Sequence, residues 1–169
     1  SIFFFFFAVV EVKAPRDITR QMLRHRSFSF QEFSQRYSDE IEFCDREVRM
    51  QDKTNRQNSI SIDDFYNGTN QYVRDCWDED TKEIIELVKE YYKDQRKVGV
   101  AKEVARVLLP EGLTMSKMYV NGTLRSWLHY LDVREGNGTQ KEHIQLANKC
   151  REVLTPVFPA VMGLTKDTN

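Results

Sequence analysis

Residues 24–37 read Arg-His-Arg-Ser-Phe-Ser-Phe-Gln-Glu-Phe-Ser-Gln-Arg-Tyr, a run that mixes cationic, aromatic and small polar side chains. Arginine is a planar, bidentate donor for phosphate or carboxylate, and histidine donates or accepts a hydrogen bond near neutral pH. The interleaved phenylalanines supply apolar faces against which a flat ring can lie. The run therefore predicts a pocket for an anionic ligand with an aromatic group, a description that a nucleotide meets.

The same run has a plainer interpretation as a strand. Phe28, Phe30 and Phe33 stand among polar neighbours, and this pattern is typical of a half-buried strand whose arginines face water. Residue chemistry alone supports the two interpretations about equally.

Length and composition indicate one soluble globular domain. The chain has 169 residues, which normally form a single domain with a substantial core, and 40% of them are hydrophobic. The formal net charge of -1 argues against a general nucleic-acid binder, because such proteins carry a basic excess.

The cysteines and the first ten residues indicate in which cellular compartment the protein is expected. Cys44, Cys76 and Cys150 are odd in number and far apart, so neither a disulfide framework nor a zinc site is indicated, and a cytoplasmic protein is expected. Residues 1–10 are strongly apolar, with five consecutive phenylalanines, but they are too short to span a bilayer. We expect a buried strand there.

Periodicity predicts both strands and helices, and we expect an α+β fold with a mixed or antiparallel sheet flanked by long helices. We expect strands at 3–13 and 113–120 and helices at 16–25, 80–97, 101–109 and 123–134. Asp80 with Glu83, and Thr139 with Glu142, resemble capping boxes that open the helix at 80–97 and a last long helix. That last helix is expected to bury Ile144, Ala147, Cys150, Val153, Leu154 and Val157. Residues 38–70 are expected to be mostly loop.

Two observations concern chemistry. The chain has no G-x-G-x-x-G or P-loop motif, and its histidines lack metal-ligand spacing. Arg106 stands among Val104, Ala105 and the apolar residues 107–109, so it is either a surface arginine or a buried one that faces a ligand or carboxylate.

The spacing of the opening run resembles that of a known family. Arg24-His25-Arg26, seven residues and then Ser34 form the R-H-R-x7-S signature of the flavin-dependent thymidylate synthases. The run Phe-Gln-Glu-Phe-Ser-Gln-Arg-Tyr at 30–37 is of the kind that viral members carry. Similar blocks follow in family order at 12–15, 103–110 and 122–134, so the resemblance extends to about residue 159 around a variable part at 39–71. The family's usual N-terminal region is expected to be missing from a single domain that spans 1–169.

This resemblance implies an FAD-bound homotetramer that makes dTMP from dUMP. Methylenetetrahydrofolate would give the carbon and NADPH the hydride, through the flavin, in the cytoplasm (of the host, if the source is viral). No nucleic acid or membrane partner is implied. By position in the family motifs, the FAD contacts would be Ser1, Arg24, His25, Arg26, Glu32, Thr123, Leu124, Arg125 and His129. The dUMP contacts would be Gln21, Arg24, Glu32, Phe33, Ser34, Gln35, Arg36, Arg106 and Arg134. Arg134 would be the catalytic residue, and no metal is implied.

The chain departs from the family pattern at two positions, and two alternatives stay open. Phe4 stands where members commonly have glutamate, and His129 stands where many have asparagine. A degenerate homologue without folate-dependent activity is one alternative. The other is a non-catalytic module for nucleotides or single-stranded RNA, with Arg and Phe as a stacking surface.

Overall fold

A computed structural model describes residues 5–34, 41–56, 58–136 and 138–163. The chain divides into two compact units, which are described separately. The first unit comprises Ser1–Ala14, Ile18–Glu32 and Ser116–Asn169, and the second comprises Pro15–Asp17 and Phe33–Met115.

The first unit is built on a three-stranded sheet in the order β1-β5-β2. These strands are β1 (Phe7–Pro15), β2 (Ser29–Glu32) and β5 (Met115–Thr123). β2 pairs with β5 antiparallel, and Phe30 lies opposite Val120. Because side chains alternate between the two faces of a strand, Val10 and Val12 of β1 and Met118 of β5 are all buried.

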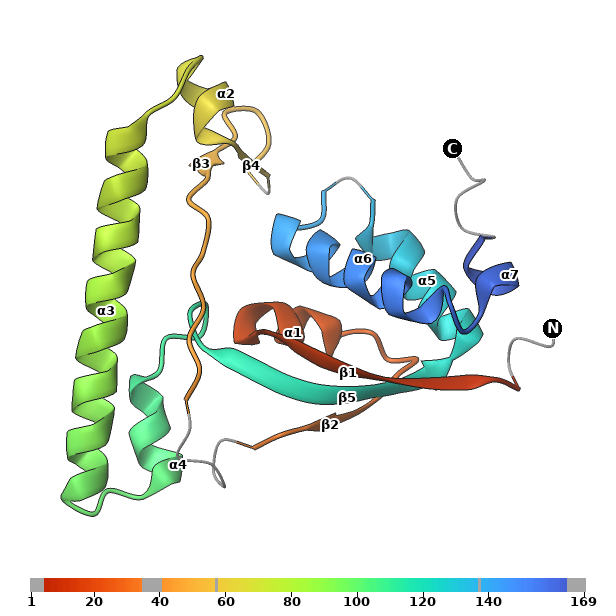
Figure 1. Ribbon diagram of the computed structural model, residues 1–169, viewed down its shortest axis with the longest axis horizontal. Coiled ribbons are helices and arrows are strands. Elements are labelled where there is room, and N and C mark those ends of the chain that lie inside the picture. Colours follow the sequence, from red (N-terminus) through yellow and green to blue (C-terminus); the bar gives the residue numbers. More distant parts are fainter. Residues whose placement is uncertain (1–4, 35–40, 57, 137, 164–169) are drawn as a thin grey trace. The chain divides into compact units, whose positions relative to one another are not determined.

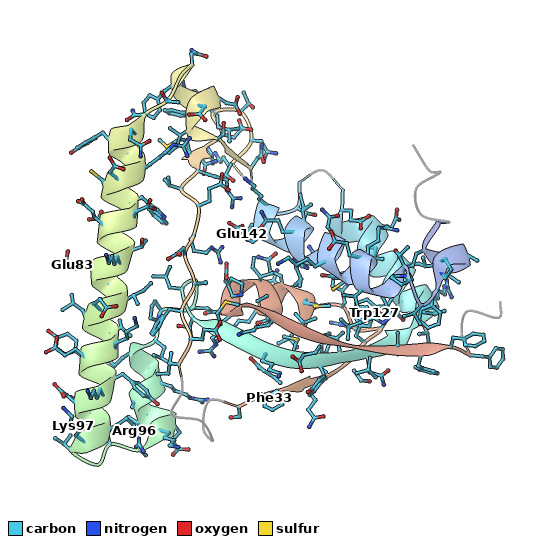
Figure 2. All side chains as sticks on the ribbon, in the orientation of Figure 1. Phe33, Glu83, Arg96, Lys97, Trp127 and Glu142 are labelled. Carbon is cyan, nitrogen blue, oxygen red and sulfur yellow. The ribbon has the colours of Figure 1, made fainter. Side chains whose placement is uncertain are left out.

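Helices cover one face of this sheet (Figure 1). They are α1 (Arg16–Met22), α5 (Leu124–Arg134), α6 (Lys141–Leu154) and the short α7 (Pro159–Met162). Trp127 lies at the centre of the core, with no exposed surface, and its indole Nε1 donates to the Ala8 carbonyl at 3.1 Å. Figure 2 shows Trp127 between α5 and the sheet. The expected α+β class and the antiparallel pairing are confirmed.

The second unit contains the hairpin β3 (Met50–Gln51) and β4 (Ser59–Ile60), followed by α2 (Ile62–Tyr66). The long helix α3 (Gln71–Lys97) leads to α4 (Lys102–Ala105) and the 3-10 helix η2 (Arg106–Leu108). A small core of Tyr92, Ala105 and Leu109 joins α3 to α4 and η2. The expectation of loop with short pieces for 38–70 is therefore confirmed over the residues described.

The apolar N-terminal run is not the buried strand that was expected. Phe5 is 81% exposed, and Phe6, Phe7 and Val9 are exposed too. The reason is the two-residue period of a strand, which turns Phe7 and Val9 away from the face that buries Val10 and Val12. Residues 1–4 lie outside the described part of the chain.

Both expected capping boxes are wrong. α3 begins nine residues before Asp80, because the Asn70 side chain caps it by accepting from the Val73 amide at 3.3 Å. α6 follows Gln140 without a side-chain cap, and Thr139 Oγ1 instead donates to the Val133 carbonyl.

The buried face of α6 is also partly different from the expected one. Val153 and Val157 are exposed, whereas His143 and Arg151 are buried. These two polar side chains have partners in the protein: Arg151 forms a bidentate ion pair with Glu135, with both distances 2.6 Å, and His143 contacts Gln21. Such partners offset the desolvation of a buried polar group, so hydrophobicity alone mispredicts this face.

Candidate functional site

The Arg24-His25-Arg26 signature lies on a tight turn after α1. Met22 at the end of the helix and Phe28 before β2 are both buried, so the core holds the turn at its two ends. The Phe28 amide donates to the His25 carbonyl at 3.1 Å and closes it. Arg24 and Arg26 are exposed and His25 is half-buried. The turn therefore presents two cations to solvent and turns the histidine inward.

His25 contacts the residue expected to be catalytic. Arg134, the last residue of α5, donates from Nε to His25 Nε2 at 2.8 Å. Because arginine only donates, Nε2 must carry the lone pair, and the imidazole is neutral with its proton on Nδ1. Burial, and then the positive charge of Arg134, lower the pKa of His25 to about 4. Among the described residues, no hydrogen bond is recorded from the two terminal Nη nitrogens of Arg134.

A second buried network lies beside this pair. Gln21 of α1 donates from Nε2 to Gln140 Oε1 at 2.8 Å, and its Oε1 lies 3.2 Å from His143 Nδ1. His143 is fully buried, and its Nε2 has no partner among the described residues. Burial, and then the positive charge of Arg134, lower the pKa of His143 to about 4. A third side chain, Tyr130, packs between the two imidazoles, with ring centroids at 5.1 Å from His25 and 5.8 Å from His143.

The start of α5 lies next to the signature turn. Thr123 caps the helix by accepting from the Ser126 amide at 3.2 Å, and Ser126 Oγ donates to the Ser27 carbonyl at 3.3 Å. This contact brings the block at 123–129 to the turn at 24–26. Arg125 and His129 are exposed on the helix, whereas Leu124 is buried and its amide donates to the Phe6 carbonyl.

The phenylalanines of the run do not form a stacking surface. Phe28 packs on Trp127 at 4.6 Å between ring centroids, and Phe30 packs against the same core. Phe33 alone of the three is exposed. The structure therefore supports the strand interpretation for Phe28 and Phe30. These two rings are not available to stack on the bases of RNA.

The remaining expected dUMP contacts are partly described. Glu32, at the end of β2, accepts from Ser116 Oγ at 2.6 Å. Phe33, Ser34 and Arg106 belong to the second unit, and Gln35 and Arg36 lie outside the described residues, as does Ser1, which was expected to contact FAD.

Arg106 does not have the apolar setting that was expected. Val104, Val107 and Leu108 are exposed, so the prediction of a buried environment is wrong for these neighbours. Arg106 itself is half-buried, and its Nε donates to the Glu103 carbonyl at 3.2 Å. No carboxylate pairs with it within the described part of the chain.

Cys44 and Cys150 are unsuited to nucleophilic catalysis. Burial raises the pKa of Cys150 to about 12 and also raises that of Cys44, where the nearby Arg46 does not reverse the effect. A catalytic thiol needs the opposite shift, because the thiolate is the nucleophile.

Sequence reasoning missed His143, Gln140 and Tyr130. His143 falls on the apolar stripe of α6, and this position was the one available signal of a buried polar group. Tyr130 lies four residues before Arg134, so the two share a helix face.

Comparison with known proteins identifies the family. A family model described as thymidylate synthase complementing protein matches residues 1–160. The chain belongs to this family, whose members with matching sequences are flavin-dependent thymidylate synthases.

Two curated relatives are similar over most of the chain. One is the probable flavin-dependent thymidylate synthase of Paramecium bursaria Chlorella virus 1, which is 41% identical over 162 residues, 95% of this chain and 72% of the relative. The flavin-dependent thymidylate synthase of Synechocystis sp. is also 41% identical, with the same coverage of 95% and 72%.

A solved structure shares the fold. It is the UMP/dUMP methylase PolB from Streptomyces cacaoi, bound with 5-Br UMP, with a TM-score of 0.78 and 23% sequence identity. The match covers 93% of this chain and 72% of PolB.

Proposed function

We propose that this protein is a flavin-dependent thymidylate synthase that makes dTMP from dUMP. Methylenetetrahydrofolate is the carbon donor and NADPH the reductant, and the enzyme acts in the cytoplasm. The observation that carries the proposal is the placement of Arg134 against the signature histidine, at 2.8 Å, in a chain of this family.

The residues present fit an FAD site. Arg24, Arg26 and Arg125 are exposed cations, and the contact of Ser126 with Ser27 brings their two elements together. Guanidinium groups suit the diphosphate of FAD because they bind oxyanions bidentately. We assign FAD to these three arginines with Ser1, His25, Glu32, Thr123, Leu124 and His129. When bound, FAD supplies the redox chemistry that passes the hydride from NADPH to the product.

The dUMP site is assigned to residues on both sides of the signature. Gln21 and Arg24 come from α1 and the turn, and Glu32, Phe33, Ser34, Gln35 and Arg36 come from the run that follows. Arg106 and Arg134 complete the set. The arginines in this set suit the phosphate. The half-buried Arg134 suits the pyrimidine ring, because partial burial strengthens the electrostatic attraction between its positive charge and a ligand.

Arg134 has the central catalytic role in this proposal. Uracil C5 is a poor nucleophile, and without an enzyme thiol the ring must become more electron-rich in another way. A cation at the O2/N3 edge stabilises the anion left by loss of the N3 proton, as a donor in an oxyanion hole stabilises an oxyanion. The raised pKa of Cys44 and of Cys150 fits a mechanism that does not use either thiol.

We further propose that the protein is a homotetramer with sites shared between subunits. Support comes from apolar side chains that each unit leaves exposed. In the second unit these are Ile84, Leu87 and Tyr91 on α3, with Val98, Val104, Val107 and Leu108 beyond it. Exposed apolar side chains in this number are consistent with a protein interface.

The test is spectroscopic and then catalytic. The purified protein is expected to show flavin absorbance and to release FAD, not FMN, on denaturation. It is then expected to convert dUMP to dTMP only with methylenetetrahydrofolate and NADPH. A protein that stays colourless after reconstitution with FAD would contradict the proposal. Bound FAD without dTMP formation would identify the degenerate homologue instead.

A further inference from the structure

We propose that His25 is a positioning residue for Arg134, which it holds by the Nε edge so that the two Nη nitrogens face the pyrimidine. This role rests on the proposed function, since it concerns the same site. It is distinct from the flavin contact that family resemblance implies for His25.

The geometry of the pair suits this role. The bond from Arg134 Nε to His25 Nε2 is 2.8 Å long, within the normal range for a hydrogen bond. A guanidinium presents its donors in a fixed fork, so anchoring Nε sets the plane of the group and the direction of the Nη1–Nη2 edge. Among the described residues that terminal edge has no recorded partner. It is therefore the edge left for a ligand with two adjacent acceptors, such as O2 and a deprotonated N3.

The histidine is itself held in place. Its ring meets the Tyr130 ring edge to face, at 81° between planes and 5.1 Å between centroids. Tyr130 is fully buried and packs on Trp127 and Phe28. Tyr130 and Arg134 lie four residues apart on α5, so they share one face of the helix. On that face, Tyr130 packs against the His25 ring and Arg134 donates a hydrogen bond to it.

The electrostatics keep His25 an acceptor. A protonated imidazole could not accept from Arg134, and burial together with the Arg134 charge disfavours that form. His143 carries no competing charge toward this site, because the same two causes keep it neutral. No carboxylate has a recorded bond to Arg134 among the described residues. The guanidinium therefore keeps its full charge for the substrate while its orientation is fixed by a neutral partner.

The role is tested by two His25 variants in two backgrounds. His25→Leu removes the acceptor, whereas His25→Gln places a carbonyl oxygen at a similar reach. Each is made in the wild-type chain and with Arg134→Ala, and kcat for dTMP formation and bound FAD per chain are measured. Thr155→Val is the matched control, because it removes a partly buried side-chain hydrogen bond of 2.7 Å beyond the far end of α6.

We expect His25→Leu to lower kcat about 10²-fold, since misplacement of a catalytic group by about 1 Å has that order of effect. His25→Gln is expected to recover most of the loss, and Thr155→Val to leave kcat near the wild-type value. With Arg134→Ala already present, His25→Leu is expected to cost little more, because residues that act as a unit are not additive. An equal loss in both backgrounds, or a loss that follows bound FAD, would overturn the proposal.

A second readout needs no turnover. Nitrogen-15 NMR is expected to show a slowly exchanging Arg134 Nε proton and a His25 imidazole with its proton on Nδ1. The slow exchange should be lost in His25→Leu and kept in His25→Gln. A fast-exchanging Nε proton in the wild-type protein would overturn the positioning role. A wild-type enzyme that makes no dTMP would contradict the proposed function and leave this spectroscopic result to decide the contact.

Discussion

Phe28 lies directly against the backbone of Gly122. A Cβ atom built on Gly122 would meet Phe28 Cδ1 at 2.3 Å and Cε1 at 2.6 Å, far inside van der Waals contact. Phe28 closes the signature turn and is 7% exposed, so its ring is confined by the core. The glycine thus allows the turn that carries Arg24, His25 and Arg26 to sit close to β5.

Gly122→Ala is expected to destabilise the protein by about 1–3 kcal/mol, the usual cost of overpacking a core. Urea denaturation followed by circular dichroism measures this. Gly112→Ala is the matched control, because a Cβ there meets nothing within 4 Å. Phe28→Leu should relieve part of the strain in the double variant. Equal stability of the two alanine variants would show that Phe28 does not confine position 122.

The ion pair of Arg151 and Glu135 is expected to be essential to the first unit. Arg151 is 9% exposed and also donates to the Met162 carbonyl at 2.9 Å, so α6 is joined to α7. Arg151→Ala leaves a carboxylate unpaired and is expected to cost about 3 kcal/mol in urea unfolding, as for other buried pairs. Lys97→Ala breaks an exposed pair with Asp94 and is expected to cost about 1 kcal/mol or less. Similar costs for both would contradict the burial argument.

The buried histidines predict that acid destabilises the fold. In the folded state the pKa of His25 and of His143 is about 4, against an ordinary value of 6.5. Between these two values the unfolded chain binds protons that the folded chain does not, so stability falls as the pH falls from 6.5 toward 4. Each histidine contributes a slope of up to about 1.4 kcal/mol per pH unit. His143→Gln, measured by unfolding across this range, is expected to reduce the slope; an unchanged slope would contradict a neutral buried His143.

Local signals predicted most of the elements of the first unit. The expected helix at 123–134 is α5 (Leu124–Arg134), and it buries Leu124, Trp127 and Leu131. Polar contacts distant in the sequence were not predictable. Arg151 is separated from Glu135 by 16 positions and His143 from Gln21 by 122, and neither periodicity nor capping rules encode such pairs.

The candidate site shows the same limit. Motif spacing selected His25 and Arg134, but their hydrogen bond spans 109 positions and depends on how α5 packs against the turn. The roles assigned to the site residues remain predictions that rest on family resemblance.

The shared site predicts complementation between subunits. An Arg36→Ala chain and an Arg134→Ala chain are each expected to be nearly inactive. If the two residues serve one site from different chains, mixed tetramers should recover part of the dTMP-forming activity, as measured after co-refolding and confirmed by light scattering. Two differently tagged Arg134→Ala stocks, mixed in the same way, provide the control without recovery. Confirmed mixed tetramers without activity would assign both residues to the same chain.

Arg134→Ala tests the central claim most directly. Removing one donor that stabilises developing charge typically costs about 10²–10³ in rate. The variant is therefore expected to form dTMP slower by that factor while it binds FAD fully and is reduced by NADPH at the wild-type rate. Arg134→Lys should recover only part of the rate, because it keeps the charge and loses the planar fork. The measurement is single-turnover formation of dTMP by flavin-reduced enzyme: a loss of about 10²–10³ supports Arg134 as the residue that activates the pyrimidine, and near-normal formation would remove it from the mechanism.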